Sequence, residues 1–266
     1  MKDIPTYSIV ITTFVHRFER YYKNLLSSIS TMRPNIDKII FVNGQHKKEF
    51  DEEYRRKIMQ YSSVFPKTYL IMSPKVRGCS FMWNTCSNFT TTDYILCLND
   101  DLIIGNGFFD DYENMLIETR KQSDQSFRIN YSFSHFSIYK KDLYEVGYFD
   151  ERLLGFGEED GDWLWRWETT KNKPLTCYNT NKLVNCVDMS PTNSENMNKH
   201  SEGGGKYSAF NRDLICNLFY EFPKNPDPSR TAYVGLYGKI AQRKMGSETP
   251  NFYPTEKWYD ENIERI

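Results

Sequence analysis

Apolar and polar positions alternate in blocks along the first hundred residues, and the blocks predict strands and helices in turn. Continuous apolar runs are typical of strands buried on both faces of a parallel sheet. Such runs cover residues 8–11, 36–42, 68–72 and 94–98. Segments with apolar residues at helical spacing separate them, at 18–32, 49–61 and 81–89. This order predicts an α/β fold with right-handed crossovers and helices on both faces of the sheet.

The pattern changes after Gly107. Helices are predicted over 108–119 and 163–169, a single strand over 128–139, and a short helical turn over 142–147 that ends at Gly147. Asn, Ser and Gly dominate residues 190–205, which indicates a loop. We therefore expect one domain over 1–205, with residues 206–266 as an extension packed on its core.

Charge and composition exclude several classes of protein. The chain has 34 basic and 35 acidic residues and no long Lys/Arg run, so we expect no nucleic-acid partner. The apolar run at 8–11 is too short for a signal peptide, and no stretch approaches the roughly 18 apolar residues of a membrane span. The six cysteines form no CxxC pair and are expected to be free thiols. We expect a cytoplasmic protein.

Polar residues follow the predicted strands at their carboxyl ends, where parallel sheets bind ligands. Thr12-Thr13-Phe14 follows the first strand, Asn43-Gly44 the second and Asn99-Asp100-Asp101 the fourth. Adjacent carboxylates repel each other and need a compensating charge, which Mg²⁺ or Mn²⁺ would supply. A turn in which Asn and Asp cap the next helix is the alternative.

Two further segments carry candidate chemistry. Glu158, Glu159, Asp160 and Asp162 lie between glycines and a Trp-rich segment. One of them could serve as the general base that takes a proton from an acceptor hydroxyl. Alternatively, they form the first turn of a helix and complement its dipole. Farther on, His200 precedes three consecutive glycines, a pattern of a loop that closes over a diphosphate or of a simple linker.

In this order, the segments resemble an inverting family 2 glycosyltransferase with the GT-A fold. The resemblance covers roughly residues 6–170. Two positions depart from the family pattern: Val42 stands where many relatives carry an Asp that binds the base, and Asn99 replaces the first Asp of the DXD metal motif. The matching segments are 8–14, 39–45, 77–84, 99–101, 146–151 and 159–162 with Arg166.

The resemblance implies a single GT-A domain with a Rossmann-like, mostly parallel sheet. Its nucleotide-binding half would be about 1–104, and its acceptor-binding half about 105–205. Asp101 and His200 would hold Mn²⁺ or Mg²⁺, and Asp160 would be the general base, supported by Glu159. Asp162 and Trp163 would contact the acceptor, although core packing is an equal alternative for the tryptophan. The nucleotide pocket would be lined by Thr13, Phe14, Asn43, Arg77, Asn84 and Asp100.

The implied reaction is transfer of a sugar, with inversion, from a nucleotide-sugar donor to a hydroxyl of a glycan or glycoconjugate. A UDP-sugar is the favoured donor, and a lipid-linked acceptor would bring peripheral membrane contact. Two alternatives stay open. A nucleotidyltransferase would normally have a Gly-rich loop after its first strand, whereas residues 12–20 contain no glycine. A catalytically inactive relative that binds nucleotide sugars is the other.

Overall fold

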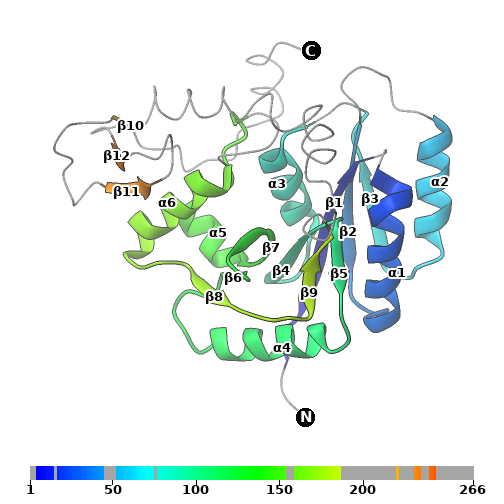
Figure 1. Ribbon diagram of the computed structural model, residues 1–266, viewed down its shortest axis with the longest axis horizontal. Helices are drawn as coiled ribbons and strands as arrows, with labels where there is room; N and C mark the ends of the chain where they lie inside the picture. The colour runs from blue at the N-terminus through cyan, green and yellow to red at the C-terminus, as the bar shows by residue number, and fades with distance from the viewer. Residues whose placement is uncertain are drawn as a thin grey trace.

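The protein was analysed as a computed structural model that describes residues 4–14, 17–44, 52–74, 77–153 and 159–186, and the backbone of three strands beyond. A seven-stranded sheet in the order β3-β2-β1-β4-β7-β6-β8 lies at its centre (Figure 1). The first four strands in this order are parallel, and β7 pairs antiparallel with β4. The strands are β1 (Tyr7–Phe14), β2 (Lys38–Asn43), β3 (Thr68–Met72), β4 (Tyr94–Asn99), β6 (Phe127–Ile129), β7 (Ser132–Tyr139) and β8 (Thr176–Tyr178).

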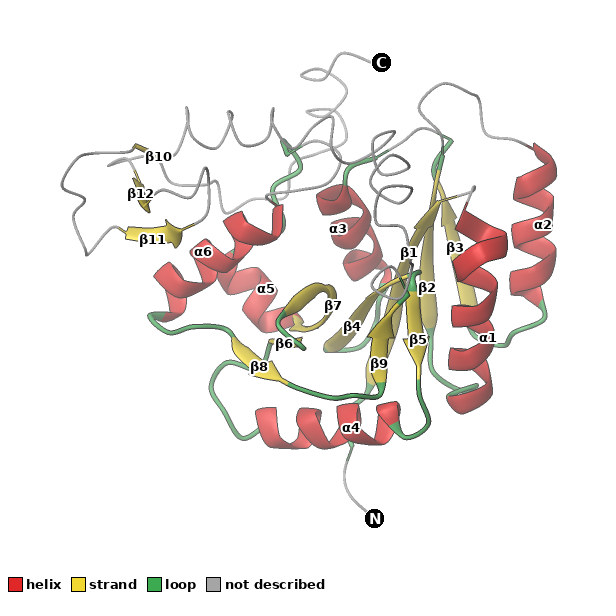
Figure 2. Ribbon diagram, in the orientation of Figure 1, coloured by secondary structure: helices red, strands yellow, loops and turns green. Residues whose placement is uncertain are grey.

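Helices cover both faces of this sheet, as the sequence predicts (Figure 2). A π-helical turn (Phe18–Tyr22) runs into the first helix. Because β1 to β4 are parallel, each connection between them needs a crossover, and the helices of the first half provide it. The helices are α1 (Lys23–Met32), α2 (Glu52–Ser63), α3 (Cys79–Phe89), α4 (Phe108–Thr119), α5 (Lys140–Val146) and α6 (Glu159–Lys171).

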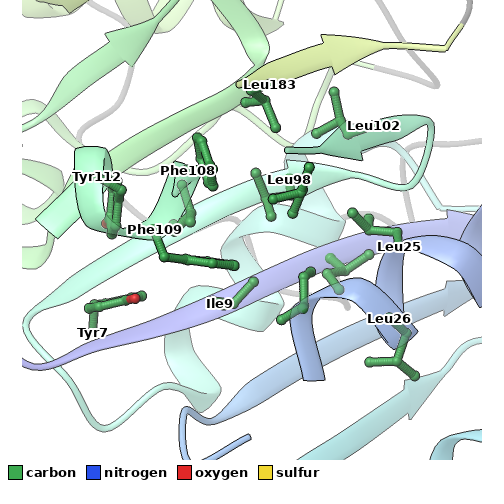
Figure 3. Packing of buried hydrophobic residues seen from close by; sticks show 14 of the residues in the cluster. Tyr7, Ile9, Leu25, Leu26, Leu98, Leu102, Phe108, Phe109, Tyr112 and Leu183 are labelled. Carbon is green, nitrogen blue, oxygen red and sulfur yellow. The ribbon is translucent and has the colours of Figure 1, made fainter. Parts of the chain in front are cut away.

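Two hydrophobic cores lie on opposite faces of the sheet, because side chains alternate along each strand. Ile9 and Ile11 of β1 pack in the first core with α1, α2 and α4, whereas Val10 packs in the second core with α3, α5 and α6. Figure 3 shows part of the first core, where Leu98 and Leu102 lie close to Leu183. Burial on both faces explains why these strands are apolar throughout.

The prediction of a single strand over 128–139 is wrong, because this part of the chain forms the hairpin β6–β7. Its two turn residues, Asn130 and Tyr131, have positive φ angles of 52° and 59°. A two-residue turn with both φ values positive matches the right-handed twist of the strands and favours Asn and Gly. Tyrosine is unusual there, so the sequence gives a weak turn signal. Helix α6 begins at Glu159, four residues before the predicted start at Trp163.

A small two-stranded sheet includes the strand that follows Asp100 and Asp101. β5 (Leu102–Ile104) pairs antiparallel with β9 (Leu183–Asn185). Within the expected extension at 206–266, the structure describes only the backbone of β10 (Tyr220–Glu221), β11 (Thr231–Val234) and β12 (Ile240–Arg243). None of the described helices is long and apolar enough to cross a bilayer.

Candidate functional site

The carboxyl ends of β1 and β4 lie side by side and bring the candidate site residues together. Thr12 is in register with Asn99, so Thr13 and Asp100, the residues that follow them, also lie close to each other. The Thr13 hydroxyl donates a hydrogen bond of 2.6 Å to Asp100 Oδ2. The sheet register therefore places one predicted nucleotide-binding residue against the predicted metal motif.

Asp100 and Asp101, which we call the acidic pair, are almost fully buried, with exposed fractions of 3% and 5%. Arg17 contacts both of them. Its Nη2 lies 2.7 Å from Asp100 Oδ1 and 2.8 Å from Asp101 Oδ2, and its Nε donates to Asp100 Oδ1 at 2.8 Å. The guanidinium also lies over the Tyr21 ring, 4.5 Å from its centroid. A buried cation thus supplies the compensating charge that two adjacent carboxylates need.

Arg17 is not among the site residues predicted from the sequence. The compensating charge was expected from a metal ion, although Arg17 lies three residues after the end of β1, the strand next to β4. The signal was available, because a basic residue near the end of an adjacent strand can reach a carboxylate at the same edge. Burial raises the pKa of Asp100 above its ordinary value, and the Arg17 guanidinium offsets part of that rise.

The acidic pair has an oxygen left over for a cation. Asp101 Oδ1 is buried and has no hydrogen-bond partner among the described residues. Burying an unpaired carboxylate oxygen is costly unless a ligand completes it. Carboxylate oxygens are the ligands that Mg²⁺ and Mn²⁺ prefer, so this donor set fits a divalent cation. The backbone fixes the position as well, since the Cys186 N–H donates to the Asp101 carbonyl at 2.7 Å.

Asn43, at the end of β2, is fully buried and joins β2 to the start of α3. Its side chain donates to the Arg77 carbonyl at 2.8 Å and accepts from the Arg77 N–H at 2.8 Å. The Arg77 guanidinium lies over the Phe81 ring, 5.0 Å from its centroid. Phe14 is half-buried at the end of β1, in register with Asn43. These three predicted residues therefore lie at one edge of the sheet.

Asn84 is also predicted to bind nucleotide, but its side chain makes contacts inside the protein. It is fully buried on α3, donates to the Phe149 carbonyl at 2.8 Å and to Glu151 Oε1 at 3.0 Å, and accepts from the Phe149 N–H at 3.0 Å. These bonds hold the segment after α5 against α3. In this structure Asn84 positions that segment through all three contacts.

The first turn of α6 contains Glu159, Asp160 and Asp162, as the helix-dipole alternative anticipates. Glu159 is buried, and Asp160 is half-buried and accepts a hydrogen bond of 2.8 Å from the Gly161 N–H. Burial raises the pKa of the Cys79 thiol, and the charges and a hydrogen bond of this turn raise it further. Because Cys79 begins α3, the acidic turn lies next to the Asn43–Arg77 bridge.

Asp162 and Trp163 serve packing in this structure. Asp162 forms a buried ion pair of 2.9 Å with Arg166, whose guanidinium also donates to one backbone carbonyl at the end of α5 and to one in the segment after it. Trp163 is 1% exposed, donates to the Gly147 carbonyl at 3.0 Å and stacks on Phe149 at 5.5 Å. The core-packing alternative therefore describes Trp163. His200 lies outside the described residues.

A second acidic group, away from the sheet edge, surrounds Lys171 at the end of α6. Its ammonium lies 2.8 Å from Asp124 Oδ1, 3.3 Å from Asp142 Oδ1, and in contact with Glu145. Asp142 Oδ2 also accepts hydrogen bonds from the backbone N–H groups of residues 125 and 126, both at 2.7 Å. We call this group the lysine-centred cluster. It is the one group of three acidic side chains in the described ranges that could hold a metal ion.

Similarity in sequence gives no assignment, since no family model and none of the curated proteins matches the chain. Similarity in structure assigns the fold. Glucosyl-3-phosphoglycerate synthase from Mycobacterium tuberculosis, solved with Mn²⁺, UDP and glucosyl-3-phosphoglycerate, matches with a TM-score of 0.52 at 12% identity, over 85% of this chain and 83% of that one. The mannosyltransferase PcManGT from Pyrobaculum calidifontis, solved with GDP-Man and Mn²⁺, matches with a TM-score of 0.51 at 10% identity, over 67% of this chain and 55% of that one.

S. aureus TarS also matches, with a TM-score of 0.50 at 13% identity, over 67% of this chain. The matched region covers 36% of TarS and 55% of PcManGT, so this chain corresponds to only part of each. At such low identity these similarities establish the fold. The protein has the GT-A fold of nucleotide-sugar glycosyltransferases, which confirms the fold expected from the sequence.

Proposed function

We propose that the protein is a metal-dependent glycosyltransferase that moves a sugar from a nucleotide-sugar donor to a hydroxyl acceptor. The observation that carries this proposal is the buried acidic pair at the end of β4, with one carboxylate oxygen unpaired. Two proteins of similar fold were solved with Mn²⁺ and a nucleotide or nucleotide sugar, which supports the same ligand class here. We favour a UDP-sugar as donor.

On the donor side, Thr13, Phe14 and the Asn43–Arg77 bridge would line the nucleotide pocket. Asp100 would contact the ribose, and Asp101 would hold the cation together with His200. Bound Mn²⁺ or Mg²⁺ would neutralise charge that develops on the departing diphosphate. The buried position of the acidic pair supports this assignment, because charge interactions are stronger away from water.

On the acceptor side, Asp160 is the general base and Glu159 supports it. Asp160 takes the proton of the acceptor hydroxyl while that oxygen bonds to the anomeric carbon and the bond from that carbon to the diphosphate breaks. Attack from the face opposite the leaving group inverts the anomeric centre. The half-buried position of Asp160, next to the start of α3, leaves its carboxylate accessible for this role. The acceptor is a glycan or glycoconjugate, and a lipid-linked acceptor would bring the protein to a membrane surface.

The first test screens donors. The full chain is incubated with UDP-, GDP-, dTDP- and CMP-sugars, with and without Mn²⁺, and thermal stability and donor hydrolysis are both measured. A ligand present at about 100 times its dissociation constant adds roughly 2.7 kcal/mol of stability. We expect a metal-dependent shift and slow hydrolysis with one nucleotide class. Binding without any turnover would favour an inactive relative. A parallel incubation with nucleoside triphosphates and a sugar 1-phosphate tests the other alternative, since release of pyrophosphate would favour a nucleotidyltransferase.

The second test addresses the base. Asp160→Asn should lower transfer by about 10²- to 10⁴-fold, the usual contribution of a general base, while donor binding changes little. Glu168→Gln makes the same carboxylate-to-amide change farther along α6 and should retain transfer. Wild-type transfer by the Asp160 variant would refute its role as the base.

A further inference from the structure

Arg17 already fills most of the coordination positions of the acidic pair. Asp100 Oδ1 accepts from Nε and lies within 2.7 Å of Nη2, while Asp100 Oδ2 accepts from the Thr13 hydroxyl and lies 3.0 Å from Nε. Asp101 Oδ2 lies 2.8 Å from Nη2. Only Asp101 Oδ1 has no partner among the described residues. One nitrogen, Nη2, therefore bridges the two carboxylates and occupies the position between them.

A divalent cation and this guanidinium would repel each other at the acidic pair, because they would bind the two oxygens of the same Asp101 carboxylate. Mg²⁺ requires oxygen ligands at about 2.0–2.1 Å in near-octahedral geometry, so a cation held by Asp101 would lie very close to Nη2. Two positive groups that close, away from bulk water, repel strongly. Nη2 also has no lone pair to offer a metal, because a guanidinium only donates hydrogen bonds. Contact of Nη2 with Asp101 therefore opposes binding of the metal at the same carboxylate.

We propose that Arg17 is the resident counter-ion of the acidic pair and competes with the divalent cation for Asp101. The Nη2–Asp101 contact breaks when the metal binds, and it forms again when the metal leaves. This inference rests on the proposed function for the identity of the cation. The Tyr21 ring provides a second contact for the guanidinium, which lies 4.5 Å from its centroid without involving either carboxylate.

The competition has two consequences. First, the protein is stable without metal, because Arg17 compensates carboxylates that are otherwise buried and unpaired. Second, the intrinsic affinity of the site for the metal is partly hidden, since each binding event must break an existing ion pair. Removing the charge at position 17 should therefore tighten metal binding while it weakens the metal-free protein. A purely structural ion pair would lose stability without any gain in metal affinity.

The test measures Mn²⁺ binding to the full chain by isothermal titration and by the electron paramagnetic resonance signal of free Mn²⁺, without nucleotide. Arg17→Gln should bind Mn²⁺ at least about tenfold more tightly than the wild type, which corresponds to about 1.4 kcal/mol. Arg20→Gln is the matched control, because Arg20 is exposed and also lies over the Tyr21 ring, at 5.1 Å. It should bind Mn²⁺ with wild-type affinity. Asp101→Asn should abolish binding in both backgrounds.

Thermal unfolding provides a second readout. Arg17→Gln should melt below the wild type without Mn²⁺ and gain more in Tm when Mn²⁺ is added. If Arg17→Gln does not fold, Arg17→Lys replaces it, because lysine keeps the charge but cannot bridge two carboxylates with a planar fork, and a smaller tightening is expected. Equal or weaker Mn²⁺ binding by the folded variant would overturn the competition but leave the transferase proposal intact. Absence of Mn²⁺ binding in every variant would overturn both the competition and metal dependence, whereas nucleotide-sugar hydrolysis would still test transfer.

Discussion

The acidic pair and the lysine-centred cluster both place carboxylates around a cation, and each includes a buried one, yet they differ in which groups satisfy the carboxylate oxygens. Around Lys171, Asp142 Oδ2 is bound by two backbone N–H groups and by the Ser126 hydroxyl, so the fold itself supplies its donors. At the acidic pair, Asp101 Oδ1 is left without a donor among the described residues. A set of carboxylates has a structural role when backbone N–H groups satisfy its oxygens, and it is a candidate ligand site when an oxygen stays unpaired.

Location supports the same distinction. The lysine-centred cluster joins α5, the end of α6 and the segment before β6, all remote from the carboxyl edge of the parallel strands. The acidic pair lies at that edge, where α/β sheets bind ligands. Three predictions separate a structural role from a ligand-binding role, and they are ordered by expected size.

Lys171→Met should cause the largest change. It removes the cation that Asp124, Asp142 and Glu145 share and leaves the buried Asp142 carboxylate without its ion pair, and breaking a buried ion pair on one side typically costs about 3–5 kcal/mol. Urea denaturation measures this loss as a lower free energy of unfolding. Lys173→Met is the control, because Lys173 is 38% exposed and, among the described residues, pairs with Asp124 alone. A loss of unfolding free energy no greater than that of the control would show that the cluster does not have a structural role.

Asp101→Asn should lower Mn²⁺-dependent transfer by about a hundredfold or more, because a catalytic metal supplies several kcal/mol of charge stabilisation. Asp124→Asn makes the same chemical change in the other acidic group and should retain transfer while it lowers stability. Steady-state rates with the donor identified in the screen measure both. Comparable rate losses in the two variants would remove the functional difference between the two groups.

The pH dependence of stability should show a smaller effect. Burial raises the pKa of Asp124, but hydrogen bonds from Lys171, Lys173 and Ser123 outweigh it, and the net pKa lies below its ordinary value. The folded protein therefore holds this carboxylate ionised, and its contribution is full above the unfolded pKa of about 3.9 and is lost as the pH falls through the lower folded pKa. The difference in free energy of unfolding between the wild type and Asp124→Asn should be largest at neutral pH and should become smaller as the pH falls toward 3. A difference that stays constant would contradict the depressed pKa.

Much of the fold was predictable because its strands and helices have unambiguous periods. The predicted bounds of β3 and α4 agree with the structure, since continuous apolar runs and helical spacing have few alternative interpretations. The β6–β7 hairpin was missed because Tyr131 adopts a left-handed conformation that sequence statistics assign to Asn or Gly. Tertiary contacts stabilise that turn, and they are not visible in local sequence.

The candidate site was predictable in part. Sheet topology alone brings Thr13, Asn43 and the acidic pair to one edge, so their shared location follows from the order of elements. The distinction between ligand contacts and internal contacts does not follow from it. Asn84 and Trp163 turn toward the protein interior, and Arg17 turns toward the acidic pair, because of packing between elements far apart in sequence. Packing between elements therefore decides the direction of these side chains.

The distribution of tryptophans makes the two cores spectroscopically distinct. Trp83, Trp163 and Trp167 all belong to the second core, where Trp163 and Trp167 lie 5.6 Å apart, whereas the described residues of the first core include no tryptophan. Fluorescence from these three tryptophans therefore reports on the side of the sheet covered by α3, α5 and α6. Circular dichroism averages over both sides. Coincidence of the two signals during unfolding would mean that the cores melt as one cooperative unit, and their separation would reveal which side gives way first.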